Sequence, residues 1–379
     1  MINPKNFYRI LNNNGIDFFT GVPDSLLKGF CNFITNNADK KNHIIAMNEG
    51  NAIGIASGYY LASGNPALVY MQNSGFGNCV NPLLSLVDKK VYSIPMLLLI
   101  GWRGEPNVSD EPQHKKQGEI TLDLLKTMGI KYSILSSDST NINQTISDSI
   151  NYIKNNNIPY ALVVKKNTFE KNNLDKNNKI DFSLKREDAV KIILDNTNEN
   201  DVFVSTTGKL SRELFEYRIA KGQSHNRDFL TVGSMGHANQ IALGIATVKT
   251  DKRIICIDGD GALLMHMGSM CLIGNLGINN FVHILINNGA HDSVGGQPTG
   301  GLRIDFSSIA KSANYKHFFN ANSKDEIILY LNKIKKLNGP IFFEIKVSKG
   351  SRKDLGRPNI SPIDNKKNFM NFLKDESKS

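Results

Sequence analysis

The sequence predicts an α/β fold built from two doubly wound parallel-sheet domains, with no middle domain. Short β-branched or aromatic runs alternate with helix-forming segments, which is typical of parallel sheets covered by helices on both faces. The chain has 379 residues, 40% hydrophobic and 21% charged, enough for two domains of ordinary size. One polar stretch interrupts the alternation near the middle of the chain, after which it resumes.

The first half of the chain contains five predicted strands. The turn after the first strand places Asp24 or Ser25 where either side chain is expected to cap a helix that runs to Phe33. A second helix is expected over 51–62, where small residues dominate. The predicted strands cover 16–20, 44–47, 67–71, 95–100 and 160–164.

The residues 165–188 are polar, charged and asparagine-rich, and we interpret 169–185 as a linker. This interpretation places a first domain at 1–168 and a second domain, with a polar C-terminal tail, at 186–379. The second domain contains a predicted helix at 211–221 and a further helix between its second and third strands. Its predicted strands cover 202–205, 253–257, 281–286 and 340–347.

The composition excludes several classes of protein. The formal charge is +10, but the lysines are scattered among asparagines rather than interleaved with aromatic residues, so we expect no nucleic-acid partner. No apolar run reaches the ~18 residues that span a bilayer, and the N-terminus lacks a secretory pattern. We therefore expect no membrane partner and a cytoplasmic location. The four cysteines form no Cys-x-x-Cys pair, so we expect reduced, mostly buried thiols and no zinc site.

The segment 253–296 carries the most informative motifs. An apolar strand runs into the sequence GDG at 259–261, and a second apolar strand runs into NNG at 287–289. Because neighbouring parallel strands end at one edge of a sheet, Asp260 and Asn288 are expected to converge there.

The chemistry of these residues suits a hard cation. Carboxylate and amide oxygens, the backbone carbonyl of Ala290 and two phosphate oxygens would complete an octahedral magnesium site. Glycines let the backbone approach phosphates, and the following helix N-terminus adds a favourable dipole. A dinucleotide-binding loop is a poor alternative, because Leu264 stands where the third glycine of G-x-G-x-x-G belongs.

This pattern resembles the signature of the thiamine-diphosphate-dependent 2-oxo acid decarboxylase family. In that family the aspartate and the second asparagine bind the magnesium ion that anchors the diphosphate. The resemblance implies thiamine diphosphate and Mg²⁺ as cofactors, with Asp260, Asn288 and Ala290 on the metal. Further contacts to the cofactor are expected from Thr207, Gly208, Gly259, Gly261 and Ala262.

Such an enzyme needs a carboxylic acid against the aminopyrimidine ring, because the protein positions a cofactor that carries the hard chemistry. Glu49 ends a predicted strand and opens the small-residue helix, which resembles the place of the family's glutamate. The segment 231–238 resembles the loop that bends the cofactor. By that resemblance Met235 props the thiazolium ring, and the Gly233 carbonyl faces the amino group of the pyrimidine.

The resemblance implies that the first domain, 1–168, binds the pyrimidine and that the second, 186–379, binds the diphosphate, and it also bears on assembly. In the family, the glutamate domain of one chain faces the metal domain of another, so a homo-oligomer is implied, at least a dimer with active sites between chains. Many relatives carry a third domain between the two, and this chain is too short for it. Carboligases such as acetolactate synthases usually have that middle domain, which counts against them.

Four further stretches, at 21–30, 101–119, 289–300 and 349–358, look like phosphonopyruvate decarboxylases. They imply conversion of 3-phosphonopyruvate to phosphonoacetaldehyde and carbon dioxide, in phosphonate biosynthesis. Sulfopyruvate decarboxylases share the architecture and are the alternative. A non-catalytic thiamine-diphosphate-binding subunit is a further alternative, against which the retention of Glu49, Asp260 and Asn288 argues.

The small substrate implies cations for its phosphonate and groups that orient its ketone. Arginine is preferred for the phosphonate because its fork binds in a bidentate manner. His114 and His291 are the better candidates for acid–base catalysis, because histidine titrates near neutrality. The candidate cations are Arg103, Lys115, Lys116, Arg303, Arg352 and Arg357, and the candidate orienting groups are Asp24, Ser25, His114, Gln117 and His291.

Overall fold

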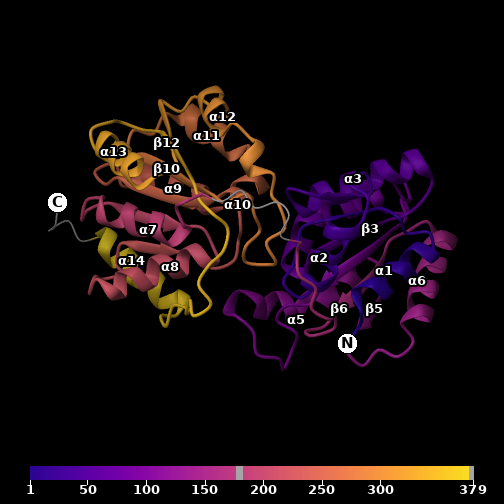
Figure 1. Ribbon diagram of the computed structural model, residues 1–379. Helices are drawn as coiled ribbons and strands as arrows, with labels where there is room; N and C mark the ends of the chain where they lie inside the picture. The colour runs from indigo at the N-terminus through magenta and orange to yellow at the C-terminus, as the bar shows by residue number, and fades with distance from the viewer. Residues whose placement is uncertain (176–181, 375–379) are drawn as a thin grey trace. The chain divides into compact units, whose positions relative to one another are not determined.

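The computed structural model describes residues 1–175 and 182–374, and the chain divides into two compact units (Figure 1). Unit 1 comprises Met1–Asn178 and Val294–Gln297, and unit 2 comprises Lys179–Ser293 and Pro298–Ser379. Part of the predicted linker 169–185 lies outside the described residues. The domain and linker boundaries expected from the sequence stay a prediction.

Unit 1 contains a six-stranded sheet in the order β2-β1-β3-β4-β6-β5, and all its strand pairs are parallel. The central strands are runs of fully buried residues, as expected for strands covered on both faces. The strands are β1 (Phe19–Gly21), β2 (His43–Ile45), β3 (Ala67–Gln72), β4 (Met96–Gly101), β5 (Lys131–Leu135) and β6 (Tyr160–Val164).

Helices cover both faces of the unit 1 sheet. One face packs against α1 (Pro4–Asn13), α2 (Lys28–Asn37) and α6 (Ile142–Asn156). The other face packs against α3 (Glu49–Ser63) and α5 (Pro112–Thr127). The same face also carries the short turns η1 (Asn73–Cys79), α4 (Val80–Pro82) and η2 (Leu83–Val87).

Unit 2 contains a second six-stranded parallel sheet, in the order β11-β12-β10-β9-β7-β8. Its central strands β9 and β10 are again almost wholly buried. The strands are β7 (Val202–Ser205), β8 (Asp228–Leu230), β9 (Ile254–Gly259), β10 (Phe281–Asn287), β11 (His317–Ala321) and β12 (Ile341–Lys346).

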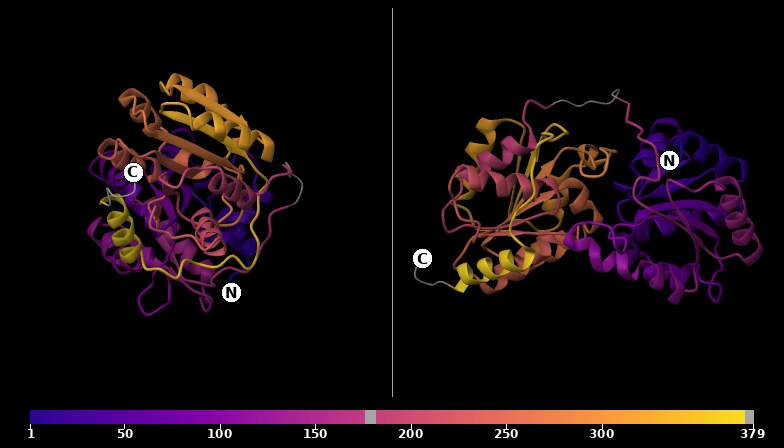
Figure 2. Two further views of the ribbon diagram at one scale, coloured as in Figure 1. Left: turned by 90° about the vertical axis from the view of Figure 1, so that its left-hand side faces the viewer. Right: turned by 90° about the horizontal axis from the view of Figure 1, so that it is seen from below.

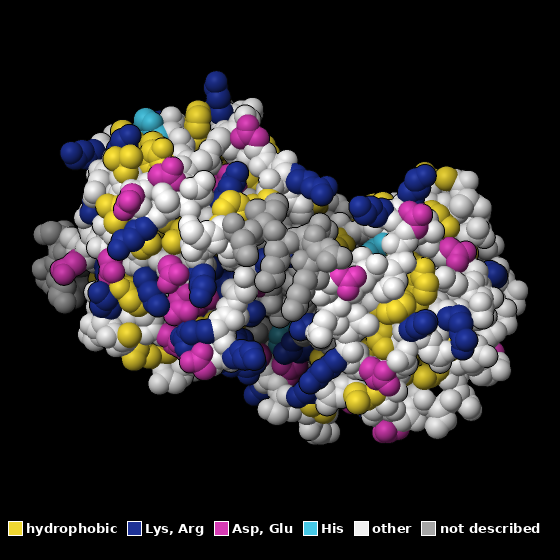
Figure 3. All heavy atoms as spheres, viewed as in Figure 1, with side chains coloured by type: hydrophobic (Ala, Val, Ile, Leu, Met, Phe, Trp, Pro, Cys, Tyr) yellow, Lys and Arg dark blue, Asp and Glu magenta, His cyan; other side chains and the backbone are white. Residues whose placement is uncertain are grey.

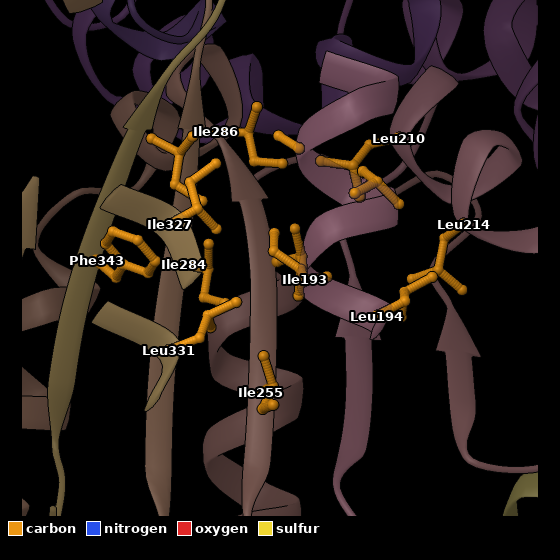
Figure 4. Close-up of a cluster of buried hydrophobic side chains, with 14 of the residues drawn as sticks. Ile193, Leu194, Leu210, Leu214, Ile255, Ile284, Ile286, Ile327, Leu331 and Phe343 are labelled. Atoms are coloured by element: carbon orange, nitrogen blue, oxygen red, sulfur yellow. The ribbon is translucent and has the colours of Figure 1, made fainter. Parts of the chain in front are cut away.

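Helices lie on both sides of this sheet as well (Figure 2). Figure 4 shows one of its two cores, in which Ile193 and Leu214 from helices meet Ile255, Ile284 and Phe343 from strands. This core lies under α7 (Arg186–Asp195), α8 (Lys209–Ala220) and α13 (Lys324–Ile334). The opposite core lies under α9 (Ala238–Val248), α10 (Asp260–Met265), α11 (Ser269–Leu276), α12 (Phe306–Ser312) and α14 (Pro362–Lys374), and the turn η3 (Gly301–Arg303) follows β10.

The predicted fold class of two parallel-sheet α/β domains is confirmed. The predicted strands at 160–164 and 202–205 match β6 and β7 to the residue. Three strands that the sequence does not predict lie at the sheet edges: β5, β8 and β11. β5 and β11 are partly exposed and β8 has only three residues, so none of these strands has the continuous apolar run that marks a central strand.

The predicted cap by Asp24 or Ser25 is wrong. Helix α2 begins at Lys28, and its N-cap residue Leu27 makes no side-chain hydrogen bond to the helix. Asp24 instead accepts a hydrogen bond from the Leu26 backbone N–H at 2.9 Å. The carboxylate therefore closes the turn that precedes the helix.

Cys31, Cys79 and Cys256 are buried and Cys271 is exposed, and all four are free, as predicted. Lys and Arg side chains are spread among acidic and polar ones on the face drawn in Figure 3. Within the described ranges, none of the helices combines the length and the apolar character that crossing a bilayer requires.

Candidate functional site

The buried carboxyl group of Glu49 is the main polar feature at the C-terminal edge of the unit 1 sheet. Glu49 is the first residue of α3, and Asn48 caps this helix by accepting a hydrogen bond from the Asn51 N–H at 2.9 Å. Glu49 is only 5% exposed. Asn78 Nδ2 donates a hydrogen bond to Glu49 Oε2 at 2.7 Å.

Burial raises the pKa of Glu49, and the hydrogen bond from Asn78 opposes that shift. A carboxyl group with a raised pKa holds a proton more readily than an exposed glutamate does, so it is suited to share a proton with a heterocyclic nitrogen. Gly75 packs directly against this group, because a Cβ at position 75 would collide with the Glu49 carboxyl. Asn78 and Gly75 are not predicted from the sequence, although they lie in the Gly/Asn-rich stretch that follows β3.

A second polar group in unit 1 brings together three of the predicted substrate residues. Arg103 Nη1 donates a hydrogen bond to Ser25 Oγ at 2.9 Å. Asp24 is fully buried, and its Oδ1 accepts a hydrogen bond from Gln72 Nε2 at 2.6 Å. Arg103 also forms an ion pair with Asp110 at 2.5 Å. A guanidinium group therefore lies beside a hydroxyl and a buried carboxyl, with one carboxylate already paired to it.

The other predicted residues of this region lie on α5. Burial, followed by the nearby charge of Arg103, lowers the pKa of His114 to about 4, so its imidazole is neutral at pH 7. His114 Nδ1 is buried and, in the part of the chain that the structure describes, has no hydrogen-bond partner. Gln117 follows one turn later and is half-buried. Lys115 and Lys116 are exposed, which places them on the solvent face of the helix.

The structure brings Asp260 and Asn288 together in unit 2. Asp260 is the first residue of α10, directly after β9, and Asn288 directly follows β10. The Asn288 backbone N–H lies 3.4 Å from Asp260 Oδ1, and the Thr299 hydroxyl donates a close hydrogen bond to Asp260 Oδ2. Burial raises the pKa of Asp260 to about 6. A buried carboxylate without a cationic side chain among its hydrogen-bond donors, Asn288 and Thr299, suits a cation-binding site.

The turn after Asn288 adds further oxygen atoms. Gly289 has φ +64, and a Cβ there would lie 2.8 Å from the Leu302 side chain, so only glycine fits this turn. The Ala290 N–H donates to Asn288 Oδ1 at 3.0 Å, which leaves a second lone pair on that amide oxygen. The carboxylate, amide and carbonyl oxygens of Asp260, Asn288 and Ala290 form a donor set that fits magnesium.

The loops after β7 and β8 lie at the same edge, since parallel strands end there. The Thr207 hydroxyl accepts a hydrogen bond from the Gly233 N–H at 3.1 Å, which joins the two loops. Gly208 has φ +100, and a Cβ there would lie 3.0 Å from Ser293 Oγ. Among the described residues, the buried hydroxyls of Thr206 and Thr231 have no hydrogen-bond partner. Such unpaired donors fit an edge that takes a polar, anionic ligand.

Met235 lies in the loop between β8 and α9 and is half-buried. This loop packs against the start of α10, because a Cβ at Gly236 would lie 3.0 Å from the Ala262 carbonyl oxygen. His291 packs on the same segment, since a Cβ at Gly261 would lie 3.2 Å from its ring. Burial lowers the pKa of His291 to about 4, so it is neutral at pH 7.

The three remaining arginines predicted for the substrate lie in unit 2. Arg352 pairs with Glu187 at 3.2 Å, with Asp354 at 3.1 Å and closely with Glu216. Three carboxylates already neutralise this guanidinium, which makes it a poor anion site. Arg303 and Arg357 are exposed.

A separate buried cluster lies inside unit 2. Potential ligand atoms of Cys256, Asp258 and His283 lie within 4.8 Å of one another on β9 and β10. His283 Nδ1 lies 3.2 Å from the Tyr315 hydroxyl, and its Nε2 lies 3.5 Å from Asp258 Oδ2. The expectation of no zinc site stays a prediction.

Comparisons with known proteins find thiamine pyrophosphate enzyme domains in both halves of the chain. The family description "Thiamine pyrophosphate enzyme, N-terminal TPP binding domain" matches residues 5–127, and "Thiamine pyrophosphate enzyme, C-terminal TPP binding domain" matches residues 206–345. The phosphonopyruvate decarboxylase of Streptomyces viridochromogenes is 28% identical over 388 residues, which cover 98% of this chain and 95% of that protein.

Sulfopyruvate decarboxylases are also similar. That of Methanosarcina acetivorans is 27% identical over 400 residues, with 98% of both chains covered. The beta subunit of sulfopyruvate decarboxylase from Methanococcus maripaludis is 30% identical over 198 residues, which cover 51% of this chain and all (100%) of that subunit.

Proposed function

We propose that this chain, which belongs to the thiamine pyrophosphate enzyme family, decarboxylates 3-phosphonopyruvate to phosphonoacetaldehyde and carbon dioxide, in phosphonate biosynthesis. It is a thiamine-diphosphate-dependent decarboxylase. The observation that carries the choice of substrate is the similarity to phosphonopyruvate decarboxylase along nearly the full length of both chains.

Thiamine diphosphate, when bound, supplies the sink for the electrons that are released as carbon dioxide leaves. In this proposal the Glu49 carboxyl holds the proton at the pyrimidine ring nitrogen. Its burial and its raised pKa support that role. Asn78 fixes the carboxyl by its hydrogen bond of 2.7 Å to Oε2, and the missing side chain at Gly75 leaves room for the other oxygen.

The residues of unit 2 would hold the diphosphate through Mg²⁺. Asp260, Asn288 and the Ala290 carbonyl would bind the cation, and the burial and elevated pKa of Asp260 support this assignment. Gly259, Gly261, Ala262, Thr207 and Gly208 would face the diphosphate. Gly233 and Met235 would contact the rings, as the family resemblance implies.

Arg103 is the best-supported of the arginines for the phosphonate. Its side chain is half-buried, donates a hydrogen bond to the Ser25 hydroxyl and lies close to the buried Asp24. Arg352 is less suitable because three carboxylates hold it. His114 and His291 are neutral at pH 7, so each would act as a base or as a neutral hydrogen-bond donor rather than as a cationic acid.

Sulfopyruvate is the second candidate substrate, and the full-length similarity to the Methanosarcina acetivorans enzyme favours it. A sulfonate carries a single charge, whereas a phosphonate carries about two. Fewer cations would then be needed, and the partial neutralisation of Arg103 by Asp110 would suit that smaller charge.

We further propose a homo-oligomer, at least a dimer, in which Glu49 of one chain and Asp260 of another serve one cofactor. The family resemblance is the support for this assembly. The exposed apolar residues Leu272 and Leu276 on α11, 49% and 52% exposed, give unit 2 an apolar surface that association would cover. Sedimentation velocity tests it, and a monomer under assay conditions would refute it.

The cytoplasmic location stays a prediction.

An initial-rate comparison tests the substrate. Purified protein with thiamine diphosphate and Mg²⁺ would receive phosphonopyruvate, sulfopyruvate or pyruvate, and aldehyde formation would be followed with a coupled reductase. We expect a kcat/KM for phosphonopyruvate at least ~100-fold above the others, about 2.7 kcal/mol in transition-state binding. A preference for sulfopyruvate would overturn the substrate and leave the family intact. Cofactor binding without any turnover would favour a non-catalytic subunit.

A further inference from the structure

A carboxylate that the sequence did not single out lies behind the candidate metal ligand Asn288. Asp292 Oδ2 accepts a hydrogen bond from Asn288 Nδ2 at 2.9 Å. The same oxygen accepts hydrogen bonds from Arg186 Nη1 and from the Gly350 N–H, both at 2.9 Å. The Asp292 side chain is 11% exposed. Three segments that are far apart in the sequence therefore donate to one oxygen atom.

The partner Arg186 is itself rigidly held. Its Nε and Nη2 donate to the two carboxylate oxygens of Glu213, both at 2.8 Å. The side chains of Arg186 and Glu213 are 7% and 1% exposed. A bidentate pair of this kind fixes the plane of the guanidinium group, so Nη1 is presented to Asp292 in one direction.

The consequence for Asn288 concerns the orientation of its amide. A carboxylate only accepts hydrogen bonds, so the Asn288 NH₂ group must face Asp292 and its oxygen must face away. The reversed amide would set its oxygen against the Asp292 carboxylate and lose the hydrogen bond. Asn288 Oδ1 accepts one hydrogen bond, from the Ala290 N–H at 3.0 Å, and keeps a lone pair for a cation.

We propose that Asp292, held by Arg186, is a positioning residue that fixes the amide oxygen of Asn288 as a ligand for the divalent cation. The proposal rests on the proposed function, because it takes Asn288 to be a metal ligand. Partners of this kind behind a metal ligand orient it, and their loss costs about 10- to 100-fold in metal affinity. The first residue of α7, directly after the predicted linker, thereby supports the metal site.

The test measures metal binding directly. Free Mn²⁺ would be followed by electron paramagnetic resonance during titration of the protein in the presence of thiamine diphosphate, for wild type, Asp292→Ala and Asp292→Asn. We expect Asp292→Ala to weaken Mn²⁺ binding by about 10- to 100-fold. Asp292→Asn keeps a neutral acceptor oxygen, which the donors Arg186 Nη1 and Gly350 N–H hold at the place of Oδ2, and loses only the charge, so we expect a smaller loss than for Asp292→Ala.

A second readout separates positioning from general damage. With Mg²⁺ at saturation, we expect kcat of Asp292→Asn to return to within about threefold of wild type, because excess cation selects the binding orientation of the amide. Asp228→Asn is the matched control, since Asp228 is a fully buried partner of Arg218 at 2.9 Å and makes no contact with Asn288 among the described residues. It should lower thermal stability and leave Mn²⁺ affinity unchanged.

The outcomes separate the two proposals. If wild type binds no Mn²⁺ with thiamine diphosphate, the proposed function fails and the role of Asp292 falls with it. If wild type binds Mn²⁺ and both Asp292 variants match it, only the role of Asp292 is overturned. That role is also overturned if Asp228→Asn weakens binding as much as Asp292→Ala does, because a general loss of stability would then explain both.

Discussion

The two units have the same strand order but present different chemistry at the same edge. Counted from the first strand of each unit, both sheets run 2-1-3-4-6-5, and all their strand pairs are parallel. The sequences of the two halves show no repeat that would indicate this correspondence. In a parallel sheet the loops after the strands meet at one edge, so equivalent loops of the two units occupy equivalent places.

The loops after the third strand show the difference best. In unit 1 this segment carries Asn78 and Gly75, which lie against the buried Glu49 at the start of the helix that follows the second strand. In unit 2 the third strand leads directly into α10, whose first residue Asp260 lies against Asn288 from the loop after the fourth strand. One edge therefore holds the buried carboxyl group that we propose for proton chemistry, and the other holds the oxygens that we propose for a cation.

The comparison teaches that the topology sets where a site forms, while a few loop residues set what the site does. It also predicts two different functional defects, depending on which unit carries the substitution. A change at the unit 1 edge should impair turnover and spare cofactor binding, and a change at the unit 2 edge should impair binding first.

The largest effect is expected from Glu49→Gln. This variant removes the acid while keeping its shape, so kcat should fall by about 10²- to 10⁴-fold. Binding of thiamine diphosphate with Mg²⁺, measured by isothermal titration calorimetry, should stay within a few-fold of wild type. If Glu49→Gln lost cofactor binding as well as turnover, Glu49 would contribute to binding too, and the proposed division of roles between the two units would be wrong.

Asp260→Asn tests the opposite edge. Removal of a direct carboxylate ligand should weaken Mg²⁺-dependent cofactor binding by more than the ~100-fold that the loss of a supporting partner costs. Asp305→Asn is a suitable control, because Asp305 caps α12 in the same unit through the Ser308 N–H at 3.0 Å. Unchanged binding in Asp260→Asn would remove this residue from the cation site.

A pair of glycine substitutions sharpens the account of unit 1. A Cβ at Gly75 would collide with the Glu49 carboxyl, whereas a Cβ at Gly77, in the same turn, meets nothing within 4 Å. Gly75→Ala should therefore lower kcat by at least about tenfold, or 1.4 kcal/mol, and Gly77→Ala should not. Equal kcat values in the two variants would show that the close approach to Glu49 is unimportant.

Arg103→Lys tests the group that we propose for the substrate anion. The lysine keeps the charge and loses the planar fork, so KM for phosphonopyruvate should rise by roughly tenfold while cofactor binding stays unchanged. Arg352→Lys is the control, since three carboxylates occupy Arg352, and its KM should match that of wild type. If Arg352→Lys raised KM and Arg103→Lys did not, the substrate anion would be assigned to Arg352 in unit 2.

The smallest effect concerns the stability of the ligand-free protein. Burial raises the folded-state pKa of Asp260 to about 6 from an ordinary 3.8, so the folded state binds this proton more tightly than the unfolded state does. The free energy of unfolding should therefore fall as pH rises from about 4 to about 6, and Asp260→Asn should lack this part of the slope. Urea unfolding at a series of pH values measures the difference, and identical slopes would contradict it.

Part of this picture could be predicted from the sequence. The central strands and the motifs at 259–261 and 287–289 are local patterns, since an apolar run followed by glycine and an acid or amide is visible in a single stretch. The role of Glu49 is predicted from its resemblance to the family's glutamate, at the start of a small-residue helix that follows a short strand. The edge strands β8 and β11 lack such continuous apolar runs and were missed.

The supporting residues could not be predicted in this way. Asn78 meets Glu49 across 29 positions, and Arg186 meets Asp292 across 106. Their roles depend on which side chains lie beside them in the folded protein. Nothing in the sequence around each residue indicates which side chains those are. Arg352 shows the converse, because its motif suggested a free cation and the fold surrounds it with carboxylates.

The most direct test of the central claim is the exchange of the C2 proton of bound thiamine diphosphate for deuterium, measured by acid quench and ¹H NMR. It needs no substrate and reports only whether the unit 1 acid activates the cofactor. We predict fast exchange in wild type and exchange slowed by at least about 100-fold in Glu49→Gln, with the cofactor still bound. Equally fast exchange in both proteins would contradict the role assigned to Glu49.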